Sequence, residues 1–144
     1  MAAPRTTAFL LGGCLLAVLV GCGGHAPVEG RVTLDGQAVE GAAVYFRPGA
    51  VGEDAGGITD ADGRFRLNGP KAEGVLPGLY WVTVSKKQYP PGMKVPSAKE
   101  MSFALSAKMI EVLPKRYTLP DKTPLRVEVP RGGKKDVLVE LEKN

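Results

Sequence analysis

Polar and apolar side chains alternate at period two along several stretches of this 144-residue chain, and this pattern constrains its fold more than any other. The alternation is clearest at residues 28–34, 42–47, 79–84, 125–129 and 137–141. Successive side chains of a β-strand point to opposite faces, so each stretch predicts a strand with one buried face. Segments rich in glycine and proline separate the stretches, as expected of turns and loops. The chain is therefore predicted to be all-β.

Two short polar segments predict tight turns between these strands. Asp35 and Gly36 follow the first strand, and both tolerate the positive φ that a two-residue hairpin turn requires. Residues 60–63 read Asp-Ala-Asp-Gly, and the strand after them has Phe65 and Leu67 on one face. We therefore expect a tight hairpin around residues 60–63, with these two apolar side chains in the core.

The stretch at residues 79–84 contains the lone tryptophan of the chain. If Tyr80, Val82 and Val84 point into the core, Leu79 and Trp81 point to solvent. An exposed indole can stack on a sugar ring or hold a protein partner, so Trp81 and Leu79 are candidate ligand contacts. Trp81 packed beneath residues 86–112, or a reversed assignment of the two faces, would leave no such surface.

Residues 86–112 fit the β-pattern poorly. The part up to residue 96 is rich in proline and lysine and predicts an exposed loop. Ser97 and Glu100 have the spacing of a capping box, and Met101, Leu105 and Met109 follow at helical spacing. A short helix within residues 98–112 is expected, although an extended segment is also compatible with residues 102–112. With about seven strands elsewhere, the pattern favours one antiparallel β-sandwich over residues 28–144.

The N-terminal segment has a different character. Residues 8–20 are apolar or small and uncharged, they follow Arg5, and they lead through Gly21 to Cys22. A helix of thirteen residues spans about 20 Å, whereas a bilayer core needs about 30 Å, so a transmembrane helix is disfavoured. An ordinary secretory signal peptide or a buried helix would not need the cysteine. The segment resembles the lipobox of bacterial lipoproteins, in which the cysteine sulfur is acylated and the chain is cut before it.

This resemblance implies a lipoprotein signal peptide at residues 1–21 and a lipidated tether at residues 22–27. Cleavage would remove Cys14 and leave Cys22 as the only cysteine, so no disulfide is expected; a Cys14–Cys22 pair is the competing interpretation. The expected location is the extracytoplasmic face of a cell membrane, held by acyl chains such as palmitate. The residue after Cys22 is Gly23 rather than aspartate, so in a cell with two membranes we expect the outer one.

Four segments occur in an order that resembles a known domain family. They are residues 28–36, 41–46, 59–65 and 76–84, and they resemble the carboxypeptidase regulatory-like domain, a transthyretin-like sandwich of seven strands. The ending, at residues 113–129, looks like that of small bacterial lipoproteins built on this domain. The resemblance implies a packing or binding module with no catalytic residues of its own.

The residues themselves offer little chemistry. His25 is the only histidine and lies in the tether, so no base remains in the domain for a serine or threonine nucleophile. A calcium loop at residues 60–63 would need further acidic ligands, but Arg64 and Arg66 follow instead. We therefore expect no enzyme activity, no cofactor and no bound metal.

The distribution of charge limits the class of partner. Residues 22–85 carry 5 basic and 8 acidic side chains, and residues 86–144 carry 13 and 7. The basic residues are scattered among acidic ones, so a nucleic-acid partner is not expected. Together these features predict a non-enzymatic envelope lipoprotein whose β-sandwich binds a protein or supports the envelope. The alternative is a domain that binds carbohydrate or another polymer through exposed aromatic side chains.

Overall fold

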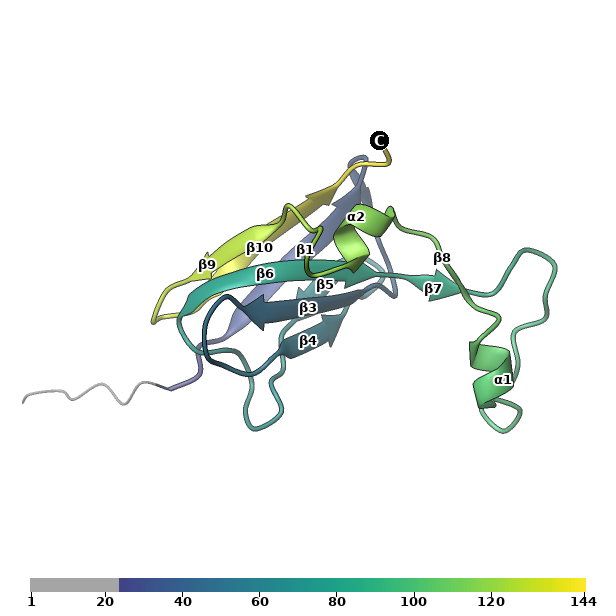
Figure 1. The fold of residues 1–144 in the computed structure, drawn as a ribbon, viewed down its shortest axis with the longest axis horizontal. Coiled ribbons are helices and arrows are strands. Elements are labelled where there is room, and N and C mark those ends of the chain that lie inside the picture. The colour runs from purple at the N-terminus through teal and green to yellow at the C-terminus, as the bar shows by residue number, and fades with distance from the viewer. Residues whose placement is uncertain (1–23) are drawn as a thin grey trace, which may run out of the picture.

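The computed structural model describes residues 24–144, which form a β-sandwich and confirm the all-β fold class (Figure 1). The predicted signal peptide at residues 1–21 and Cys22 lie outside the described residues. The elements, in chain order, are β1 (Val28–Leu34), β2 (Gln37–Ala38), β3 (Ala43–Pro48), β4 (Ala55–Ile58), β5 (Arg64–Arg66), β6 (Gly78–Ser85), β7 (Lys87–Gln88), α1 (Phe103–Ser106), β8 (Ile110–Glu111), α2 (Lys115–Thr118), β9 (Arg126–Val129) and β10 (Lys134–Leu141).

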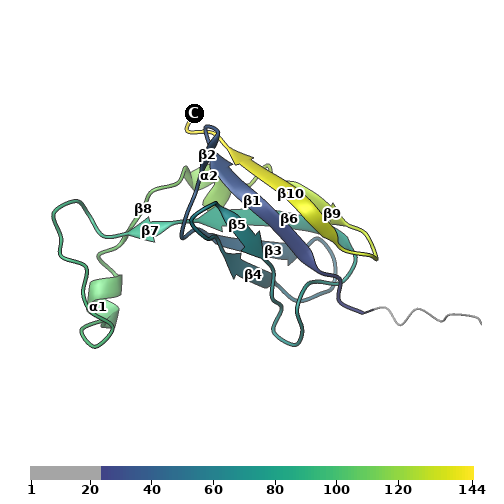
Figure 2. The same ribbon diagram turned by 180° about the vertical axis from the view of Figure 1, so that it is seen from behind.

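Two four-stranded sheets make up the sandwich. In the first sheet, β1 lies between β10 on one side and both β2 and β5 on the other. The second sheet has the order β4-β3-β6-β9 and is antiparallel throughout. Figure 1 shows the second sheet from its outer side, and Figure 2 shows the first.

The pairing of β1 with β10 is parallel, which the alternation of side chains alone could not predict. A turn at residues 130–133 reverses the chain after β9 and carries β10 into the other sheet. Because β1 and β6 both start at this end of the sandwich, β10 leaves the turn in the same direction as β1. The sheets thus hold eight strands rather than about seven, and one of their pairings is parallel.

The core lies between the two sheets and contains the side chains that the alternation placed there. Val82 and Val84 on β6 have no exposed surface, and Tyr80 is 3 % exposed. The rings of Phe65 and Tyr80 lie 6.2 and 5.9 Å from the ring of Phe46, measured between centroids, so aromatic packing joins the two sheets. The turn at Asp35 and Gly36 also forms as predicted, with φ of 48° and 82°.

The hairpin predicted around residues 60–63 is wrong in one respect, because its two strands belong to different sheets. The strand before the turn, β4, pairs with β3, whereas β5 after the turn pairs with β1. The two arms of the turn are joined by an isolated bridge, Gly56 with Asn68, and by the hydrogen bond from the Asp60 N–H to the Arg64 carbonyl oxygen, rather than by a ladder between β4 and β5. A Cβ at Gly57 would lie 2.2 Å from the Arg66 carbonyl oxygen, so glycine permits the close crossing. The turn is thus a corner between the sheets.

Residues 86–112 project from the sandwich, and we call them the arm (Figures 1 and 2). Its base is the two-stranded ribbon of β7 and β8. The predicted helix within residues 98–112 is present but only four residues long, as α1. The Glu100 carboxylate accepts the Ser97 N–H as in a capping box, but the Ser97 hydroxyl donates to the same carboxylate, and the Glu100 N–H donates to the Ser97 carbonyl oxygen. The helix begins later, where the Ser102 hydroxyl accepts the Leu105 N–H.

A tyrosine side chain closes the turn that leads into β6. The hydroxyl of Tyr80 donates a hydrogen bond of 2.7 Å to the carbonyl oxygen of Leu76, four residues earlier. Gly78 between them has φ of 152°, which a side chain would disfavour. This contact resembles the tyrosine corner of immunoglobulin-like sandwiches. It explains in physical terms why the segment reads Leu-Pro-Gly-Leu-Tyr.

We predict that Tyr80→Phe lowers the free energy of unfolding by about 1 kcal/mol, the usual net value of one such hydrogen bond. Burial raises the pKa of Tyr80 above its ordinary value of 10.0. The unfolded state therefore loses this proton first, and stability falls as the pH rises above about 10. Urea unfolding at pH 7 and at pH 11 measures both effects. The pH-dependent part should be smaller in Tyr80→Phe, whereas Tyr45→Phe, whose side chain is exposed, should match the wild type at both pH values.

Candidate ligand-binding surface

The outer face of the second sheet carries the two candidate ligand contacts. Leu79 is 52 % exposed and Trp81 is 36 % exposed, and Tyr45 on the neighbouring strand β3 is 50 % exposed. Tyr80, Val82 and Val84 point inward, as the sequence predicts. The arm projects away from the sandwich (Figure 1), and Trp81 is not buried beneath it. The faces of β6 are therefore assigned correctly, and Trp81 reaches the surface.

Trp81 lies in a row of side chains that crosses three strands. The register places it directly opposite Arg47 on β3 and Arg126 on β9. The guanidinium carbon of Arg126 lies 4.5 Å from the centroid of the indole ring, within the range of a cation–π contact. Two backbone carbonyl groups, of Thr123 and Leu125, accept hydrogen bonds from Arg126 and hold it there. One face of the indole is therefore covered by Arg126, and a ligand would contact the part of Trp81 that remains exposed.

Tyr45 also has a structural contact. Its ring lies over Gly56 on the edge strand β4, and a Cβ added to Gly56 would lie 2.9 Å from the ring atoms. An aromatic side chain over a glycine of a neighbouring strand shields that glycine's backbone from water. The outer face thus offers a partly exposed apolar surface rather than a cleft.

The base of the arm is held by a carboxylate that the sequence did not single out. Glu111 accepts hydrogen bonds from the Ser85 hydroxyl, from the Lys86 N–H at 2.8 Å and from the Leu113 N–H at 3.0 Å. The three donors lie at the end of β6, just before β7 and just after β8, where the chain leaves the sandwich and returns to it. One side chain therefore fixes the direction in which the arm projects. Neither this role nor that of Arg126 can be found without the pairing of distant strands.

Residues 60–63 form a tight turn that is closed by hydrogen bonds of its own aspartate. One carboxylate oxygen of Asp60 accepts the N–H groups of Asp62 and Arg64, each at 2.9 Å. Gly63 has φ of 74°, the left-handed conformation that glycine adopts most easily. The Asp60 carboxylate thus closes its own turn. Within residues 24–144, no three His, Cys, Asp or Glu side chains lie close enough to hold a metal ion.

His25 lies next to the sandwich, where it helps to line a hollow with Glu53, Lys71 and Tyr80. Its neighbour Ala26 is buried, and exchanges hydrogen bonds with Val75 of 2.7 and 3.0 Å. The contacts of the sandwich therefore extend to Ala26. No helix among residues 24–144 has the length and apolar character needed to cross a bilayer.

Comparison with known proteins gives one match. The family model described as "Carboxypeptidase regulatory-like domain" matches residues 27–129, which is more than half of the chain. No curated protein and no solved structure matches. The match covers both sheets apart from β10, and it includes the arm.

We predict that Glu111→Ala loosens the arm without unfolding the sandwich, because its three partners all lie at the base of the arm. Hydrogen bonds to a charged group contribute about 1.5 to 3 kcal/mol each, so the local opening of residues 86–112 should become at least tenfold more frequent. Hydrogen exchange followed by mass spectrometry of peptides measures this frequency of opening. Glu128→Ala, which removes an exposed carboxylate on β9, should leave exchange in the arm unchanged. Equal exchange in Glu111→Ala and wild type would contradict the clamp.

Proposed function

Because the chain belongs to the carboxypeptidase regulatory-like domain family, whose domains are non-catalytic in themselves, we propose that it is a non-enzymatic binding or structural module held at a membrane by acyl chains on Cys22. The lipobox-like segment at residues 19–22 supports the anchor. The anchored face is extracytoplasmic, and Gly23 after the cysteine favours the outer membrane in a cell that has two.

The observation that carries this proposal is the short distance along the chain between Cys22 and the sandwich. Ala26 is already bonded to Val75, so four Cα–Cα steps separate the acylated residue from the fold. Four steps of extended chain span about 14 Å. The end of the sandwich where β1 begins therefore faces the membrane closely.

The arm leaves the sandwich at the end opposite to the one where β1 begins. Strand β6 begins at Gly78, opposite Val129. The turn at residues 130–133 follows Val129, and the N–H of the next residue, Lys134, donates to the Pro27 carbonyl oxygen. Strands β6 and β1 therefore begin at the same end of the sandwich. Strand β6 ends at Ser85, next to the base of the arm. Eight residues of strand span about 23 Å. The arm is thus at the opposite end of the sandwich from the point where β1 begins (Figure 1).

We predict that Cys22→Ser releases the protein from the membrane fraction and abolishes labelling by radioactive palmitate. Cys14→Ser is the matched control, because Cys14 lies in the segment that cleavage removes. It should leave both fractionation and labelling unchanged. Palmitate labelling that persists in Cys22→Ser would contradict the anchor.

A second candidate function is the binding of carbohydrate at the outer face of the second sheet. The exposed part of Trp81, with Leu79 and Tyr45 beside it, is the observation that favours it. Aromatic rings at protein surfaces bind the apolar faces of sugars by stacking.

For this candidate we predict that Trp81→Ala lowers affinity for a bound glycan at least tenfold on an array of envelope polysaccharides. Ile58→Ala, which removes an exposed apolar side chain elsewhere on the same face, should keep the affinity. Circular dichroism of both variants checks that the sandwich is intact. No binding of the wild-type protein to any glycan on the array would contradict this function.

A further inference from the structure

The outer face of the first sheet carries two arginines at directly opposite positions. The register pairs Arg31 on β1 with Arg64 on β5, and it pairs Arg31 with Leu138 on β10. One row across three strands therefore reads Arg64, Arg31, Leu138. Like charges at directly opposite positions of an antiparallel pair are destabilising. Such a pair needs an explanation, because an exposed sheet face accepts many other side chains.

In the neighbouring pair on the same two strands, the charge of the arginine is compensated by a carboxylate. Glu29 on β1 lies opposite Arg66 on β5, and the two side chains form an ion pair. In residues 24–144, by contrast, no carboxylate oxygen lies within 4.0 Å of a nitrogen of Arg31 or Arg64. The Nε of Arg31 donates to the carbonyl oxygen of Asp62 at 2.9 Å. That bond orients the guanidinium, and among residues 24–144 its two terminal nitrogens have no hydrogen-bond partner, so they could donate to an anion.

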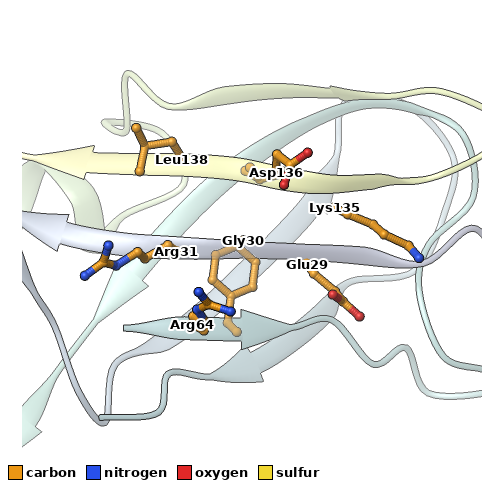
Figure 3. A pocket seen from close by; sticks show the side chains of 9 residues that line it. Glu29, Gly30, Arg31, Arg64, Lys135, Asp136 and Leu138 are labelled. Carbon is orange, nitrogen blue, oxygen red and sulfur yellow. The ribbon is translucent and has the colours of Figure 1, made fainter. Parts of the chain in front are cut away.

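The surface beside these arginines is hollowed by two irregularities of the sheet. The register steps from Val28 opposite Lys134 to Gly30 opposite Val137, so β10 has one extra residue there, a β-bulge. Gly30 cannot be replaced without movement, because a Cβ would lie 2.3 Å from the Val137 carbonyl oxygen. The hollow has a volume of about 290 Å³ (Figure 3). Its lining includes both arginines and, on β10, Lys135, Asp136 and Leu138.

We propose that this hollow binds the oxyanion of a small organic monoanion, a carboxylate or a phosphate diester, with its apolar part against Leu138. The anion would accept hydrogen bonds from the guanidinium groups of Arg31 and Arg64, which favour oxygen anions with two acceptor atoms. Leu138 is 57 % exposed and continues the same row. Glu29 is paired with Arg66, and Lys135 and Asp136 in the lining have opposite charges, so the excess positive charge of the hollow comes from the two arginines. This site is independent of the proposed anchor and of the Trp81 surface.

The test measures the unfolding temperature, Tm, of the full protein as it is purified from cells in detergent, with increasing sodium benzoate or sodium diethyl phosphate. Sodium chloride keeps the ionic strength constant. A ligand that binds the folded state alone raises Tm in a saturable way. We expect such a rise with at least one of the two anions. A rise with benzoate alone identifies a carboxylate ligand, a rise with diethyl phosphate alone identifies a phosphate diester, and a rise with both supports a general oxyanion site.

Variants separate binding from structure. The double variant Arg31→Gln/Arg64→Gln should bind the same anion at least tenfold more weakly. Arg131→Gln, which removes one exposed arginine from the turn before β10, should bind as the wild type does. Without ligand, Arg64→Gln should not lower Tm, because it relieves a repulsion. An equal rise in wild type and double variant, no saturable rise with either anion, or a fall in Tm of unliganded Arg64→Gln would each overturn the proposal.

Discussion

The pairing of β6 with β3 and β9 is the constraint on which the rest of the structure depends. This strand supplies three of the innermost side chains of the core, and its backbone joins the two halves of the second sheet. Both of its ends are held by single side chains. Tyr80 closes the turn before it, and Glu111 binds the chain where it leaves the sandwich. Because the strand cannot shift without breaking these contacts, its two ends keep a constant separation.

That separation gives the molecule two different ends. The chain enters the sandwich at Ala26, beside the start of β6, and the arm leaves it beyond Ser85. With an anchor at Cys22, the first end would lie against the lipid and the second would face away from it. The outer faces of both sheets lie at the sides of the line from Ala26 to the arm, so ligands could approach them without meeting the membrane. A rigid body with accessible flanks suits a module that binds or supports other components.

Much of the fold could be predicted because alternation is a local property: it placed Val82, Phe65 and Leu67 in the core and Trp81 outside it. The rest depends on register between distant segments. The parallel return of β10 and the split of β4 from β5 need knowledge of which strands meet. Arg31 and Arg64 are ordinary exposed residues until β1 and β5 pair. In the arm, the expected short helix forms as α1, and residues 110–111 are extended as β8. The spacing of apolar residues could not fix the bounds of that helix, because most helical stability comes from packing against other parts of the fold.

The direction of the sandwich relative to the membrane tests the account most directly. A spin label is attached either to Val51→Cys, in the loop that follows β3 at the end where β1 begins, or to Ser97→Cys, in the arm. A paramagnetic agent placed in the lipid headgroups speeds the relaxation of the label if the label lies near the membrane. Vesicles of purified acylated protein serve for both, since an acylated Cys22 would leave no other free thiol in the mature chain. The account predicts strong relaxation at residue 51 and none at residue 97. Equal relaxation at both positions, or stronger relaxation at residue 97, would contradict it.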